Sequence, residues 1–105
     1  MDLKVYQEKV KCFVEKNNIN SSIEVRLIDL YSEIGEFSKE VLKGNSYGKK
    51  SFEQTKESKN ELGDVFFSLI CVANLLDVDL GEALESVIDK YIKRFAEKRD
   101  IGSGR

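Results

Sequence analysis

Two short stretches of the sequence, SEIGEF and ELGDVF, each carry two acidic residues three positions apart, with a glycine just before the second acid. The pairs are Glu33 with Glu36 and Glu61 with Asp64. Acids at i and i+3 of a helix share one face, and both pairs border apolar runs. If the two segments face each other, each like-charged pair at ~4 Å costs roughly 4 kcal/mol at an effective dielectric of about 20.

Either protons or a divalent cation must offset such repulsion. A cluster of hard oxygen ligands suits Mg²⁺, with Mn²⁺ as a substitute, better than zinc or copper. Gly35 and Gly63 each cost about 1 kcal/mol inside a helix relative to alanine, and we expect close approach of another backbone or of a ligand there. The alternative reading places the acids on solvated helix faces, because a chain with 19 acidic residues contains such pairs by chance.

The composition narrows the chemistry further. A chain of 105 residues forms one domain, and the absence of histidine excludes Ser-His-Asp and Cys-His catalysis and most zinc sites. The net charge of −2 gives the chain no overall positive potential that would attract nucleic acid. We expect no membrane segment, because the longest apolar stretch has 12 residues. The N-terminus lacks the apolar core of a signal peptide, and two lone cysteines suit a reducing compartment, so we expect a cytoplasmic protein.

Apolar periodicity predicts an all-α fold of four helices with short connections and antiparallel neighbours. The first helix covers residues 3–16. The second begins after Ser21 or Ser22 and ends near Gly44. The third begins between residues 51 and 56 and continues to about Leu76. The fourth follows Asp79 as N-cap, and residues 101–105 are expected to form a flexible tail.

The third predicted helix is apolar in nearly every direction from Val65 onward. Such a helix is expected to be central and buried on most sides. Three other short helices cannot cover it fully. We therefore expect a four-helix bundle that is completed by homodimerisation.

The segment SEIGEF…ELGDVFFSLICVANLLDVDLGEAL resembles the MazG-like nucleotide pyrophosphohydrolases of the all-α NTP pyrophosphatase superfamily. The family pattern is E-x-x-E on one helix and E-x-x-D on the next, and the similarity extends over most of the chain. The resemblance implies hydrolysis of a nucleoside triphosphate between its α- and β-phosphates, which gives a monophosphate and pyrophosphate. It also implies a dimer or a dimer of dimers.

By position, the resemblance makes Glu33, Glu36, Glu61 and Asp64 the magnesium ligands, with Glu33 or Glu36 as the base that takes the proton of the attacking water. Many members carry Glu where this chain has Ser32, so a role that depends on that extra acid is in doubt. Four further residues are candidates for binding the substrate: Arg94, Lys90 and Lys98 on the fourth helix, and Asn74 on the third. The alternatives for these residues are contacts with a helix end for the basic side chains and with a neighbouring helix for Asn74.

Two other functions remain open at this stage. The chain could be a non-catalytic helical dimerisation or regulatory module of the same fold, or it could be a phosphoribosyl-ATP pyrophosphohydrolase. The pattern around SEIGEF is closer to MazG-like enzymes, and a role in clearing surplus or noncanonical nucleotides follows from that resemblance.

Overall fold

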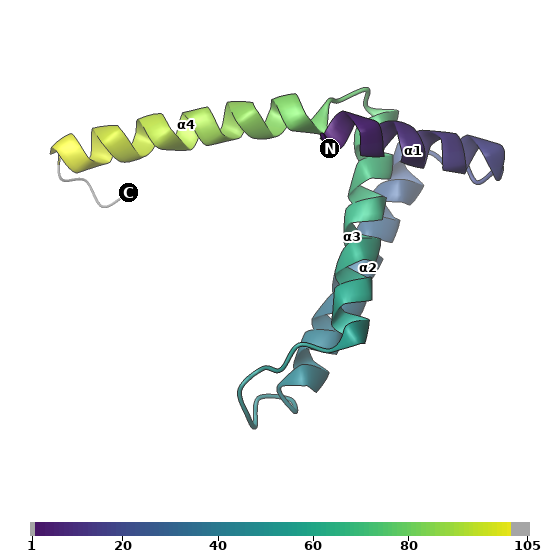
Figure 1. Cartoon of the computed structure of the whole chain (residues 1–105), viewed down its shortest axis with the longest axis horizontal. Coiled ribbons are helices and arrows are strands. Elements are labelled where there is room, and N and C mark those ends of the chain that lie inside the picture. Colours follow the sequence, from purple (N-terminus) through teal and green to yellow (C-terminus); the bar gives the residue numbers. More distant parts are fainter. Residues whose placement is uncertain (1, 102–105) are drawn as a thin grey trace.

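The computed structural model describes the backbone of residues 2–101 and the side chains of residues 2–98. The chain forms four helices, and residues 2–101 contain no strand. In Figure 1, two long helices form a hairpin, and the other two lie across one end of it. The prediction of an all-α fold is therefore confirmed. The helices are α1 (Leu3–Lys16), α2 (Ile23–Gly44), α3 (Lys56–Leu75) and α4 (Leu80–Ile101).

Side-chain caps set the starts of the helices. The Ser22 hydroxyl accepts a hydrogen bond from the backbone N–H of Val25 (3.2 Å), and Asp79 accepts one from the N–H of Glu82 (3.0 Å). At the start of α3, Thr55 and Ser58 form a reciprocal capping box. Each cap satisfies a backbone donor that has no partner within the helix, which explains why the predicted starts are confirmed.

Helix α4 ends at residue 101, which is the first position of the predicted C-terminal tail. The remaining tail positions, 102–105, lie outside the described residues. A search of the described helices finds none that is long and apolar enough to cross a membrane.

Another backbone segment was expected to pack closely against Gly35 and Gly63, but the structure shows such packing at Gly44. A Cβ built on Gly35 or Gly63 would meet nothing within 4 Å, so no other backbone segment among residues 2–101 packs against either residue. A Cβ on Gly44, by contrast, would lie 2.6 Å from the Phe52 ring and 2.8 Å from the Glu53 carbonyl oxygen. The reason is the returning loop, which folds back over the last turn of α2 before α3 begins.

The core of a single chain is small. Among the described residues, the only apolar side chains in the buried class are Ile70, Cys71 and Ala73, all on α3. The expectation that α3 is buried on most sides is wrong within one chain, since Leu62 is 53% exposed and Phe66 is 43% exposed. The radius of gyration, 17.7 Å, also exceeds the ~13 Å of a compact domain of this length.

Helix α4 explains much of this extended shape. It packs chiefly against α1, and Figure 1 shows it running away from the hairpin rather than along it. One chain therefore does not close a four-helix bundle by itself. The apolar stripe of α4 lies open to solvent over Leu84, Val87, Ile88, Tyr91, Ile92 and Phe95.

A buried glutamine fixes the start of α4. The Gln7 amide nitrogen donates to the Asn74 side-chain oxygen (3.0 Å) and to the Val78 carbonyl (2.9 Å), and the Gln7 amide oxygen accepts from the N–H of Leu80 (2.8 Å). The Asn74 amide nitrogen in turn donates to the Gln7 carbonyl (3.0 Å). These bonds join α1 to the end of α3 and the first residue of α4, so Gln7 orients two helices at once.

We expect Gln7→Ala to lower the free energy of unfolding by about 2 kcal/mol, because it leaves half-buried polar groups of Asn74 and Leu80 without partners. Urea unfolding followed by circular dichroism measures this change. Gln54→Ala, in the exposed loop before α3, is the matched control and should change stability by less than about 0.5 kcal/mol. Equal effects of the two substitutions would contradict the role given to Gln7.

Candidate metal centre

Three of the four acids singled out from the sequence meet across the α2–α3 hairpin. Glu33 of α2 and Glu61 and Asp64 of α3 each offer one carboxylate oxygen, and these three oxygens lie within 4.8 Å of one another. Glu33 and Glu61 are half-buried, and Asp64 is exposed. The predicted convergence of the two motifs is therefore seen for these three residues, because antiparallel packing brings the middle of α2 level with the first turns of α3.

The carboxylates disfavour each other's ionisation. Burial raises the pKa of the Glu33 carboxyl, and the charges of Asp64, Glu36 and Asp29 raise it further. Burial also raises the pKa of Glu61, with added contributions from Asp64, Glu36, Glu33 and Glu40. The structure gives these three acids no basic partner: the ion pairs among the described side chains are Lys43–Glu40 and Lys50–Glu53. The cluster is thus a concentration of negative charge without a protein cation.

The donor set fits a hard divalent cation. All three groups are carboxylates, and oxygens on opposite sides of Mg²⁺ lie about 4.2 Å apart when each is about 2.1 Å from the ion. The three carboxylate oxygens lie within 4.8 Å of one another, which is the range of separations that ligands of one such ion require. Glu33, Glu61 and Asp64 are therefore the residues that could hold such an ion.

Glu36 lies outside this group of three oxygens. It is exposed, and it is one turn further along α2 than Glu33. Its charge nevertheless raises the pKa values of both Glu33 and Glu61, so it is within electrostatic reach of the cluster. The structure separates Glu36 from the three clustered acids, a distinction that the repeated sequence pattern did not provide.

The basic candidates for substrate binding do not reach the carboxylates of their own chain. Lys90, Arg94 and Lys98 lie on α4, which extends away from the hairpin (Figure 1). Lys90 and Arg94 both sit near the Tyr91 ring, with Nζ 5.1 Å and Cζ 6.0 Å from its centroid. Arg94 and Lys98 also line a shallow hollow together with Tyr91 and Phe95. The fold therefore places these cations on a separate arm.

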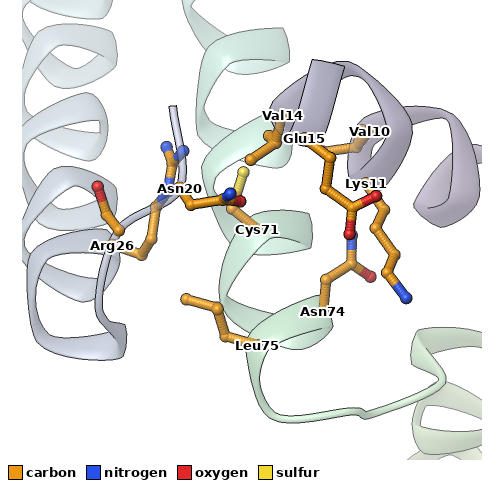
Figure 2. Close-up of a pocket in the computed structure, with 10 residues that line it drawn as sticks. Val10, Lys11, Val14, Glu15, Asn20, Arg26, Cys71, Asn74 and Leu75 are labelled. Atoms are coloured by element: carbon orange, nitrogen blue, oxygen red, sulfur yellow. The ribbon is translucent and has the colours of Figure 1, made fainter. Parts of the chain in front are cut away.

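Asn74, the remaining candidate, lies at the far end of α3 from the cluster. Its amide oxygen and nitrogen both bond to Gln7, as described above. This arrangement matches the helix-to-helix alternative that the sequence left open. One face of Asn74 also lines a cavity beneath α1, shown in Figure 2.

Sequence reasoning missed Arg26 and Gln7, both of which are buried. Arg26 follows Ile23 by three positions and precedes Leu30 by four. Gln7 follows Leu3 by four positions and precedes Val10 by three. Both residues therefore stand on the apolar stripes of their helices. A polar residue on such a stripe is a signal for a buried polar contact, and it was present in the sequence.

Residues 22–97 match the family model described as the MazG nucleotide pyrophosphohydrolase domain, and this range contains all four motif acids. The chain belongs to the MazG nucleotide pyrophosphohydrolase family. The resemblance inferred from the two motifs is therefore confirmed.

Individual relatives agree with this family assignment. The MazG chain is 43% identical over 68 residues to the uncharacterized protein YpjD of Bacillus subtilis (strain 168), covering 62% of this chain and 60% of that protein. Its structure is similar to that of the Bacillus-conserved MazG protein, a nucleotide pyrophosphohydrolase, with TM-score 0.73 and 30% identity over 87% of this chain and 89% of the other. The crystal structure of B. subtilis YpjD matches with TM-score 0.72 and 33% identity, covering 87% and 93%.

We expect Glu33→Gln to stabilise the metal-free MazG chain at pH 7. When the folded state raises the pKa of a carboxyl, the protein becomes less stable as the pH rises from the ordinary pKa of 4.5 through the raised value. The ionised form of Glu33 therefore opposes folding at neutral pH. The unfolding temperature in EDTA should rise by about 2 °C, because interactions among partly solvated charges stay below about 1 kcal/mol.

The same substitution should reduce the increase in unfolding temperature that millimolar MgCl₂ gives the wild type. Differential scanning calorimetry with EDTA or MgCl₂ measures both effects. Glu8→Gln, on exposed α1, is the matched control and should leave both values unchanged. A loss of stability of Glu33→Gln in EDTA would contradict the repulsion described here.

Proposed function

We propose that this MazG domain hydrolyses nucleoside triphosphates at the α–β phosphoanhydride bond, in a reaction that depends on Mg²⁺. The observation that carries the proposal is the convergence of three carboxylate oxygens, from Glu33, Glu61 and Asp64, without a basic partner. Such a cluster suits phosphoryl transfer, which requires positioning and neutralisation of charge. Membership of the family supports the same reaction.

Mg²⁺ bound here would neutralise phosphate charge and lower the pKa of a bound water. Water then adds across the anhydride: its oxygen bonds to one phosphorus, the bond from that phosphorus to the bridging oxygen breaks, and the products are a monophosphate and pyrophosphate. A carboxylate must accept the water proton. We assign this role to Glu36 rather than Glu33, because Glu36 lies outside the three-oxygen group and keeps its lone pairs free.

The cations for the triphosphate would come from a second copy of the chain. Arg94, Lys90 and Lys98 lie on an α4 arm that extends from its own hairpin and carries an open apolar stripe. A homodimer, or a dimer of dimers, would cover this stripe and could bring the basic arm to the partner's carboxylates. The family's activity also suggests a role in removing surplus or noncanonical nucleotides.

We expect the purified protein with MgCl₂ to release pyrophosphate from at least one member of a panel of NTPs and dNTPs. Glu36→Gln should lower kcat about 100-fold or more and leave the Mg²⁺-induced rise in unfolding temperature intact, because it removes the base and not a ligand. Asp64→Asn should weaken both activity and the response to Mg²⁺. An absence of turnover across the panel would favour a non-catalytic module, and turnover of phosphoribosyl-ATP alone would indicate the histidine-pathway alternative.

A mixing experiment tests the shared site. Asp64→Asn and Arg94→Ala should each be nearly inactive alone. If α4 serves the partner's carboxylates, a mixed dimer contains one site with both lesions and one intact site, so co-refolding equal amounts should restore about a quarter of wild-type activity. Mixing Asp64→Asn with Glu61→Gln is the control and should restore none, since both lesions lie in the same carboxylate cluster. Lack of recovery in the first mixture would place Arg94 in the site of its own chain or outside it.

A further inference from the structure

A cavity that the proposed reaction does not use lies between α1 and the end of the hairpin nearest to it. Its volume is about 100 Å³, and its walls come from α1, the α1–α2 connection, α2 and α3. Figure 2 shows the side chains of Asn20, Cys71 and Val14 gathered at its centre, with Arg26 on one side and Asn74 and Leu75 on α3. The cavity is formed within one chain.

The walls combine apolar surface with hydrogen-bonding groups. Val14 and Leu75 supply the apolar part, and the Asn20 amide supplies both a donor and an acceptor. Arg26 is only 9% exposed, and one of its nitrogens donates to the Ile19 carbonyl (2.6 Å). Its guanidinium has five donors and no carboxylate partner among the described side chains. An apolar pocket with a few fixed polar groups is typical of a site for a small ring compound.

The volume limits the size of that compound. A closed apolar cavity of about 150 Å³ holds one benzene molecule. This cavity is smaller, about 100 Å³, and partly open, so it can enclose most of one six-membered ring but has no room for two fused rings.

The cavity is aligned with the carboxylates. Arg26 precedes Glu33 by seven residues on α2, and Cys71 follows Asp64 by seven on α3. Seven residues are two helical turns, so each pair shares a helix face at a separation of about 10 Å along the axis. Asp29 lies one turn from Glu33 toward the cavity, and its charge acts on the carboxyl of Glu33 and on the thiol of Cys71.

Along the hairpin, the carboxylate cluster is therefore followed by Asp29 and then by the cavity. A nucleotide has a matching order of phosphates, sugar with hydroxyl donors, and base. We propose that this cavity is the base subsite of the enzyme, that it accepts a pyrimidine and excludes a purine, and that Asp29 faces the sugar. This inference rests on the proposed function, but its principal test does not require turnover.

The principal test follows the side-chain amide signals of Asn20 by NMR in the full chain with MgCl₂. Three probes are added separately: α,β-methylene-UTP, α,β-methylene-ATP and inorganic tripolyphosphate. The Asn20 signals should shift with the uridine analogue and change at least tenfold less at equal concentration with the other two. Equal shifts with tripolyphosphate would show that the cavity binds anions rather than a base. Equal shifts with the adenosine analogue would show that it also accepts a purine. Either result overturns the proposal, as does an absence of any shift.

Kinetics provide the second test. Asn20→Ala, at an exposed position on the α1–α2 connection, should raise KM for UTP or CTP about tenfold with little change in kcat. Cys71→Met, which fills the cavity, should do the same, whereas Cys12→Met makes the identical change at the exposed cysteine and should have no effect. Hydrolysis of an abasic deoxyribose triphosphate should be insensitive to all three. Unchanged KM in both cavity variants would overturn the proposal.

The two proposals fail in different ways. If the NMR shifts occur as expected but no nucleotide is hydrolysed, the pyrimidine site stands and the catalytic function does not. If the wild type hydrolyses nucleotides but favours purines, or the Asn20 signals do not respond, the catalytic function stands and the base subsite does not.

Discussion

The repulsion among carboxylates on the two hairpin helices is the constraint on which the rest of this structure depends. Packing of α2 against α3 holds Glu33, Glu61 and Asp64 together, although burial and the neighbouring acidic charges oppose ionisation of Glu33 and Glu61. The apolar contacts along the hairpin must offset this cost, and Glu33 and Glu61 are half-buried beside them. A divalent cation held between these carboxylates, as in the proposed function, would relieve the repulsion.

A second constraint is the small core of a single chain. A domain of this size usually buries most of its apolar side chains, but few of the described ones are buried here. Ile92 and Phe95 of α4, for example, are 63% and 62% exposed. Large open apolar patches mark surfaces for association. The exposed stripe of α4 and the basic groups along the same helix are two aspects of one arrangement, and the proposed dimer accounts for both. Stability and substrate binding would then depend on the same interface.

Polar residues on apolar stripes give the end of the hairpin near α1 its shape. Gln7 links α1 to the start of α4, and Arg26 binds the α1–α2 connection through the Ile19 carbonyl. Because these groups are buried and hydrogen-bonded, they hold α1 at a defined position above α2 and α3. The space left between them is the cavity to which we assign the base. The same polar contacts that orient the helices therefore also shape a candidate binding site.

The sequence by itself determined the four helices and the level at which the two acidic motifs meet. Caps and apolar spacing act through hydrogen bonds and contacts a few residues apart, so they can be read locally. The loop of residues 45–55 is long enough for α3 to return antiparallel to α2. Only the tertiary structure decided that Glu36 stands apart from the other three acids, because the rotation of one helix against another depends on packing along their whole length. It also decided the direction of α4, which rests on a hydrogen bond between Gln7 and Leu80, residues that are 73 positions apart. Contacts at that separation leave no periodic signal in the chain.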